Sequence, residues 1–355
     1  MAGLVERASA LFRFVQGSLS QPTHFISIRA DHTDSPDEMG GTLSAHEHYF
    51  EARINELYLT NRREWFINYD PMAIALAEFR YAGQPTAIPF IVGPSMIQKI
   101  GNKLPQGMVF ADTRVAGPQP YRGDGLALTL ILCRLKRDDM LRRLLRVVES
   151  TSKTLDFTGA TAIYTKVANA VLDGIEEVTG AADAAVSVLG WRQDFRPVEC
   201  GFYALIDGSV PALAENRLWV RKRQLVLGDG LGSAEPFRTA DYLLFSISSV
   251  KREDVSGLPF YPTYVQAMQE ASQANKENDE RWESAKVKLS ALYSWANTSP
   301  DLTREHVKQL KEEWKADIVA AHDEARKLSS LGPGRASDTP EAAEDRRSAL
   351  DILNL

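Results

Sequence analysis

The most apolar run of the chain, Leu126–Cys133 (LALTLILC), limits what the chain can fold into. Glycine- and proline-rich sequence precedes the run, charged residues follow it, and it lacks the alternation of a strand with one solvated face. These properties predict a strand that is buried on both faces and therefore covered by two layers of structure. The run is far shorter than the roughly 20 residues that a membrane-spanning helix needs.

Other segments with the pattern of strands lie on both sides of this run. Pro89 cannot donate to a strand ladder, which predicts an edge or bulged strand around it. The segment 101–124 is rich in glycine and proline, and we expect it to be a loop. The expected strands are Tyr49–Leu59, Trp65–Tyr69, Ala73–Tyr81, Ala87–Val92, Ala185–Leu189, Gly201–Ile206, Leu218–Leu227 and Tyr242–Val250.

Helical periodicity appears in three places. Residues 1–17 have the spacing of a short amphipathic helix, and residues from about 138 to 180 have the spacing of two helices inserted between the strand regions. Near the end of the chain, two apolar stripes flank the short segment Ser299–Asp301. They predict two long helices that form an antiparallel αα-hairpin.

These patterns predict an α+β fold with a β-rich, sandwich-like core, two inserted helices and a C-terminal αα-hairpin. A length of 355 residues fits about two domains. We expect a core domain over residues 1–255 and a helical hairpin over 256–331. Residues 332–355 read as a disordered tail, because they are rich in glycine, proline and charge until a short apolar end.

The composition of the chain disfavours several classes of partner and compartment. The net charge of −6 does not favour nucleic acid or an anionic membrane as a partner, and the first helix lacks the basic face of a membrane-surface helix. The N-terminal sequence is not that of a secretory signal. Two cysteines cannot form a disulfide framework, so we expect a cytoplasmic protein.

One histidine pair is a candidate for metal chemistry. If residues 46–48 form a strand, His46 and His48 share a face, as two ligands of one metal often do, and Glu51 or Asp70 could add a third ligand. No recognised metal-site spacing accompanies them. The alternative is a solvated entrance to a strand.

The other chemical motifs are incomplete. Neither Cys133 nor Cys200 lies in a sequence that indicates a nucleophilic thiol, so we expect both to be small buried hydrophobes. The glycine-rich segment Leu227–Ser233 lacks the ending of a phosphate-binding loop, and we expect a hairpin turn there. The sequence thus predicts no catalytic residue and no cofactor.

Three features point to binding of another protein. A basic segment would place four side chains on one strand face, where they could contact an acidic partner or simply protect an edge strand: Arg217, Trp219, Arg221 and Arg223. The predicted hairpin carries Trp282 and Trp314. The apolar end of the tail could fold on a partner or on the chain itself, with Leu350, Ile352 and Leu353 as anchors, or could be inert.

We therefore expect a non-catalytic interaction or assembly protein that contacts its partner through the hairpin, the basic segment and a detachable tail. The alternative is a hydrolase or metal-dependent enzyme with a site near His46 and His48. No motif carries a resemblance to a known family.

Overall fold

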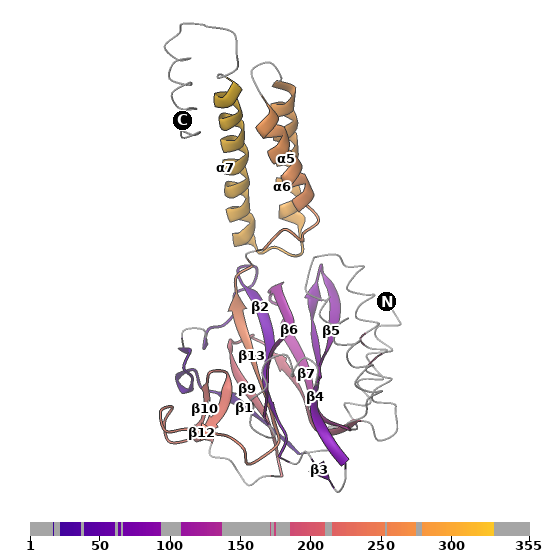
Figure 1. Ribbon diagram of the computed structural model, residues 1–355, viewed down its shortest axis with the longest axis vertical. Coiled ribbons are helices and arrows are strands. Elements are labelled where there is room, and N and C mark those ends of the chain that lie inside the picture. The colour runs from indigo at the N-terminus through magenta and orange to yellow at the C-terminus, as the bar shows by residue number, and fades with distance from the viewer. Residues whose placement is uncertain are drawn as a thin grey trace. The chain divides into compact units, whose positions relative to one another are not determined.

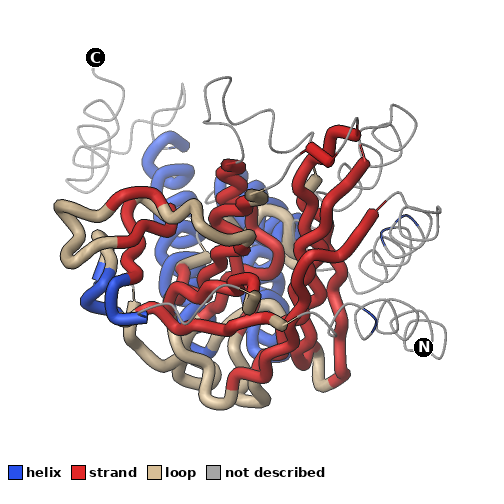
Figure 2. The backbone as a smooth tube through the Cα atoms, turned by 90° about the horizontal axis from the view of Figure 1, so that it is seen from below, coloured by secondary structure: helices blue, strands red, loops and turns tan. Residues whose placement is uncertain are grey.

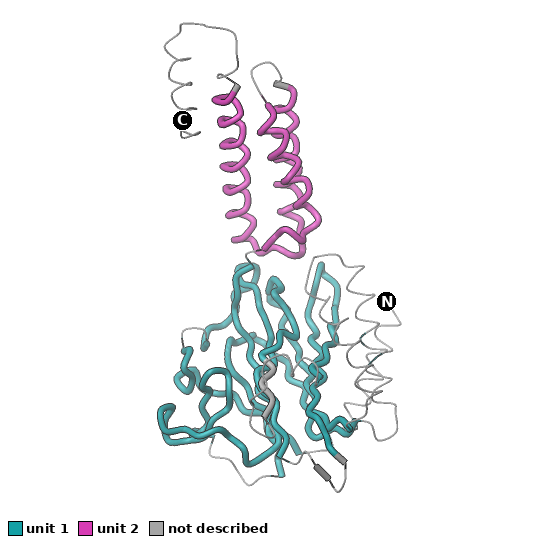
Figure 3. The backbone as a smooth tube through the Cα atoms, in the orientation of Figure 1, with its two compact units in different colours: residues 1–252 teal, residues 253–355 magenta. Residues whose placement is uncertain are grey.

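The computed structural model describes most of the two strand regions and the C-terminal helices. The chain divides into two compact units, residues 1–252 and 253–355 (Figure 3). The described residues are 22–36, 39–60, 63–64, 67–93, 108–136, 185–209, 215–252, 254–274 and 279–329, together with Gly17, Val171 and Gly174.

The first unit is built of antiparallel sheets joined by loops (Figures 1 and 2). Its first sheet has five strands in the order β1, β9, β13, β2, β6. Strands β9 and β13, which come after residue 137, lie between β1 on one side and β2 and β6 on the other, so distant parts of the chain form one sheet. The bounds are β1 Thr23–Ile28, β2 Tyr49–Tyr58, β6 Met108–Pro120, β9 Gly201–Asp207 and β13 Tyr242–Val250.

The second sheet has β4 and β7 at its centre. Strand β8 pairs with β7, whereas β3 and β5 pair with different parts of β4. The bounds are β3 Arg63–Glu64, β4 Ile67–Tyr81, β5 Gln84–Val92, β7 Leu126–Lys136 and β8 Ala185–Phe195.

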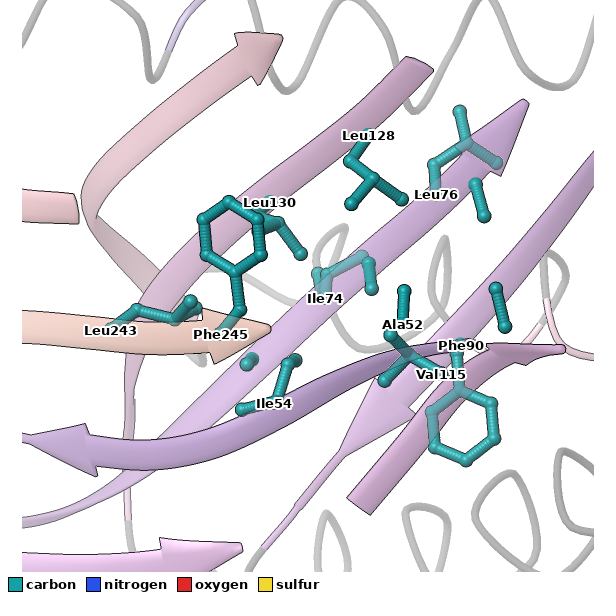
Figure 4. Packing of buried hydrophobic residues seen from close by; sticks show 14 of the residues in the cluster. Ala52, Ile54, Ile74, Leu76, Phe90, Val115, Leu128, Leu130, Leu243 and Phe245 are labelled. Carbon is teal, nitrogen blue, oxygen red and sulfur yellow. The ribbon is translucent and has the colours of Figure 1, made fainter. Parts of the chain in front are cut away.

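The main hydrophobic core lies between these two sheets. Figure 4 shows Ile54 and Phe245 of the first sheet among Ile74 and Leu130 of the second, and all four are buried in one cluster. This arrangement confirms the expected α+β class with a sandwich-like core of open antiparallel sheets.

Strand β7 confirms the interpretation of the apolar run. It pairs with β4 on one side and β8 on the other, and residues 126–133 are buried without interruption. Both faces of the strand are therefore shielded from water. Val171, a described residue of the expected inserted helices, belongs to the same buried cluster.

A smaller sheet covers part of the outer face of the first sheet. Its strands are β10 Leu218–Arg221, β11 Gln224–Leu227 and β12 Glu235–Pro236. Leu218 and Leu225 pack there against Phe202 and Leu244 in a second core. The loop of residues 228–234 joins β11 to β12 as an antiparallel connection, as expected for the glycine-rich segment.

The expected loop at 101–124 is wrong, because it contains β6. This strand pairs only with β2 among the described strands, so its prolines need no partner on the open side. Gly117 allows the pairing: its φ is +87°, and a Cβ there would lie 2.2 Å from the carbonyl oxygen of Phe50. Glycine and proline here shape an edge strand rather than a loop.

Two further strand predictions need correction. The expected strands Trp65–Tyr69 and Ala73–Tyr81 overlap a single strand, β4. The expected strand Leu218–Leu227 is a hairpin, because Lys222 and Arg223 both have positive φ and form its two-residue turn. The edge prediction for Pro89 is confirmed, since β5 pairs only with β4 among the described strands.

The described part of the second unit contains three helices where the sequence predicted two. They are α5 Tyr261–Gln273, α6 Asp279–Thr298 and α7 Arg304–Ser329. Helices α6 and α7 form the expected antiparallel pair, and α5 packs against both of them (Figure 1). Sequence analysis missed α5 because its sequence has few large apolar residues and relies on Ala267 and Ala271 for close packing.

Several expectations lie outside the described residues. These are the N-terminal helix, most of the two inserted helices and the tail with Leu350, Ile352 and Leu353.

One buried ion pair links the two main sheets. Asp241, which is 2% exposed, accepts hydrogen bonds from the Thr60 backbone N–H and hydroxyl at 2.5 and 2.6 Å. Its other oxygen accepts from Arg134 of β7 at 3.0 Å. Asp241 precedes β13, and Thr60 follows β2, so one carboxylate joins both sheets.

We expect Asp241→Ala to lower the free energy of unfolding of the first unit by about 3 kcal/mol, because Arg134 and the Thr60 N–H would lose their buried partner. Urea denaturation followed by far-UV circular dichroism measures the change. The control is Asp229→Ala, which removes an exposed carboxylate paired with Arg217 and should cost under about 1 kcal/mol. Equal effects of the two substitutions would contradict the assigned role.

Candidate functional site

Trp314, a predicted partner-binding residue, lies in the core of the helical unit. It is 3% exposed and packs edge-on against Phe260, with 5.3 Å between ring centroids. Beside it, the Tyr264 hydroxyl of α5 donates to Asp317 of α7 at 2.8 Å. Trp314 therefore holds the helices together and offers no surface to a partner.

Trp282 is partly covered by its own unit. Its ring stacks on His322 of α7 with 3.9 Å between centroids and an interplanar angle of 6°. The ammonium of Lys286 lies 5.8 Å from the same ring. Trp282 is half-buried, so one face of the ring serves the contact between α6 and α7.

The helical unit nevertheless presents most of the exposed large apolar side chains. Among the described residues, six such side chains are exposed, and only Val186 belongs to the β-rich unit. The other five lie on the three helices although these make up the smaller unit: Val265, Val287, Trp295, Val319 and Leu328. Exposed apolar groups that gather on one module mark an interaction site more often than scattered ones do.

On helix α6, the exposed apolar side chains follow a regular spacing. Val287 is 69% exposed and Trp295 is 49% exposed, and with Ala291 between them they follow the spacing i, i+4, i+8. We call these three residues the α6 stripe. The spacing places them on one side of the helix, while Ala285, Leu292 and Ala296 occupy the buried side.

Sequence analysis missed the α6 stripe because the helix has two apolar sides. The residues at Trp282, Ala285, Leu289, Leu292 and Ala296 were sufficient to explain an amphipathic helix. The remaining signal was Val287 and Trp295 in the polar half of that helix, where lysine and serine are the usual choice.

The basic segment is largely occupied by contacts within the chain. Trp219 and Arg221 share a face of β10, and Trp219 stacks on His32 at 3.9 Å between centroids. Arg221 donates to the Leu231 carbonyl at 3.2 Å, and Arg217 pairs with Asp229 at 2.9 Å. The predicted row of four side chains on one face is wrong, since the strand ends at Arg221 and Arg223 lies in the turn.

Arg223 instead joins a charged cluster on the outer face of β2 and β6. It pairs with Asp112 at 2.7 Å, while Arg53 donates to the Asp112 carbonyl at 3.1 Å. Arg53 and Arg114 also pair with Glu51. Two carboxylates thus offset most of the charge of three guanidinium groups, and the cluster attaches the β10–β11 turn to the first sheet.

A buried carboxyl group lies beneath the small sheet. Glu56 of β2 is fully buried and accepts a hydrogen bond from the Leu225 N–H of β11 at 2.8 Å. Burial raises the pKa of the Glu56 carboxyl to about 7, although the Leu225 N–H, Tyr242 and the positive charge of Arg238 oppose the shift. The guanidinium of Arg238 lies 5.5 Å from the Tyr58 ring centroid.

The histidine pair does not have the predicted geometry. His46 lies in a turn with a φ of +67°, and β2 begins only at Tyr49. The Nδ1 atom of His48 accepts from the Ser44 N–H at 2.9 Å, and the Nδ1 atom of His46 faces Arg122 at 3.2 Å. The two rings therefore do not share a strand face.

The predicted third ligands lie apart on different sheets. Glu51 is buried against arginines in β2, and Asp70 is buried in β4. The described part of the chain contains no group of three or more histidine, cysteine or acidic side chains arranged to hold a metal ion.

Both cysteines are free, buried thiols. Burial raises the pKa of Cys133 to about 12 and raises that of Cys200 as well. A nucleophilic thiol needs the opposite shift, so the environments of both residues suit packing.

No helix in the described ranges is long and apolar enough to cross a membrane.

In comparisons with known proteins, no family model, no curated protein and no solved structure matches the chain.

We expect Trp314→Ala to destabilise the helical unit by about 3–5 kcal/mol, because it leaves a cavity in the core. Trp295→Ala should change stability by less than about 1 kcal/mol, since half of its side chain is already in water. Thermal unfolding followed by the helical circular dichroism signal compares the two variants. Similar losses of stability in both would contradict the assignment of Trp295 to the surface.

Glu56 predicts a pH-dependent stability. The folded chain holds this proton up to about pH 7, whereas an unfolded glutamate releases it near its ordinary pKa of 4.5, so rising pH through that window lowers the free energy of unfolding. Between pH 5 and 8, Glu56→Gln should gain about 2–3 kcal/mol relative to the wild-type chain. Urea denaturation of both proteins across this range measures the gain. A pH-independent difference would show that the folded carboxyl titrates normally.

Proposed function

We propose that the chain is a non-catalytic interaction or assembly protein that binds a partner protein through its helical unit. The concentration of exposed large apolar side chains on α5, α6 and α7 carries this proposal. The β-rich unit has its apolar residues in two closed cores and only Val186 among the exposed ones described.

The α6 stripe is the centre of the proposed contact. Tryptophan is the residue type most often responsible for binding energy at interfaces, and Trp295 lies between small and polar neighbours that a partner could cover. Val287 lies two helical turns away on the same side. A partner helix, or an apolar groove that receives α6, would bury both anchors together.

The basic segment would play at most a supporting role in binding the partner. Its arginines already contact Asp229, Asp112 and the Leu231 carbonyl, so a partner would have to displace these contacts. The free, buried cysteines support a reducing compartment, and we propose the cytoplasm.

A pair of matched variants tests the proposal. Full-length protein is immobilised and exposed to an extract of its native source, and the captured proteins are quantified by mass spectrometry. Val287→Ser combined with Trp295→Ala should reduce capture of the principal partner at least about tenfold, because hot-spot residues contribute about 2 kcal/mol or more each.

Val186→Ser is the control, since it removes the same type of exposed side chain from the other unit. It should leave capture unchanged. Retention of the partner by the double variant, or equal loss in the control, would overturn the proposed function.

A further inference from the structure

We infer that the apolar segment 349–355 of this same chain binds the α6 stripe and competes with the partner for it. This inference rests on the proposed function for its consequence but not for its test. The residues after Ser329 lie outside the described part of the structure.

The first support is a match in size and chemistry. The segment reads Ala349–Leu355 (ALDILNL), with Leu350 and Leu353 at the i, i+3 spacing of one helix face. As a helix it would be about 10 Å long, and the α6 stripe from Val287 to Trp295 spans about 12 Å, at about 1.5 Å per residue. Two leucines on one helix face are apolar anchors of the kind that pack against an exposed tryptophan and valine.

The second support is the position of the segment's attachment point. Helices α6 and α7 run antiparallel, as the contacts of Trp282 with His322 and of Tyr293 with the Lys311 carbonyl require. The end of α7 at Ser329 is therefore near the start of α6. Val287 is the member of the α6 stripe closest to that end.

The third support is the length of the connecting segment. Trp282 and His322 stack on each other and so lie at the same level along the two helices. At about 1.5 Å per residue, Ser329 lies about 10 Å from His322 along α7, and Ala291 lies about 13 Å from Trp282 along α6 in the opposite direction. The separation along the helices is thus about 24 Å. A flexible chain of about 20 residues has a root-mean-square length of about 22–27 Å, and residues 330–348 have the glycine, proline and charged composition of such a chain.

A linker whose average length equals the distance it must span gives the highest effective concentration, of the order of 1 mM. A segment with a dissociation constant of about 0.1 mM for the α6 stripe would then cover it in about nine of ten molecules. Partner binding would be weakened about tenfold, and release or proteolytic removal of the segment would restore it.

Disulfide trapping in the full chain tests this inference without any partner. The variant Val287→Cys/Leu353→Cys should form an intramolecular disulfide under mild oxidation at least about tenfold faster than Lys315→Cys/Leu353→Cys. Position 315 is exposed on α7 and lies about 21 Å along the helix from Ser329, close to the roughly 18 Å that separates Ser329 from position 287, but it is not part of the α6 stripe. The native cysteines are buried with raised thiol pKa values, so they compete little.

Equal trapping rates at positions 287 and 315 would overturn the inference, and so would disulfide-linked dimers, which would make a second copy the occupant. A second set of variants uses the pair Val287→Cys/Ile352→Cys as its background. In this background, Leu350→Asp alone or Leu353→Asp alone should slow formation of the disulfide, whereas Asn354→Ala should not. If trapping succeeds while the capture experiment fails, the inference stands and the proposed external partner does not. If capture succeeds and trapping fails, only the inference falls.

Discussion

The burial of β7 on both faces is the constraint on which the first unit depends. A strand with apolar residues at successive positions cannot lie at a surface, so one face needs the opposing sheet and the other needs a second layer. Strands β4 and β8 flank it and satisfy its backbone, and the side chains of β2 and β13 cover it on the inner side. A buried polar link joins the two sheets from Arg134 to Asp241, whose carboxylate also accepts hydrogen bonds from the backbone N–H and the hydroxyl of Thr60.

The features that sequence analysis predicted correctly are those decided by local pattern. The run Leu126–Cys133 has the pattern of a strand buried on both faces, and Pro89 predicts an edge or bulged strand, because each prediction depends on a property of the residues themselves. Strand β6 was missed for the opposite reason. Its glycines and prolines are typical of loops, and only the close approach of Gly117 to Phe50 explains why they belong to a strand.

The candidate site was harder to predict because exposure depends on neighbours that the sequence does not place. Trp282, Trp295 and Trp314 are chemically equivalent, yet the third is buried against α5, a helix that periodicity did not reveal. The turn at Lys222 and Arg223 lacks the asparagine or glycine that usually marks such hairpins, so the basic segment read as one continuous strand. A tertiary contact decided the role of each residue: Trp314 packs against Phe260, and Arg223 pairs with Asp112.

The prolines of β5 and β6 have a consequence for how other chains could join this one. Pro85 and Pro89 lie in β5, and Pro118 and Pro120 lie in β6, and these strands are the outer members of the two main sheets on one side. Each proline removes an N–H that an added strand would need, so neither sheet readily extends by backbone pairing along these two strands. Recognition there is left to side chains, which favours selective contacts over the indiscriminate strand-to-strand stacking that leads to fibrils.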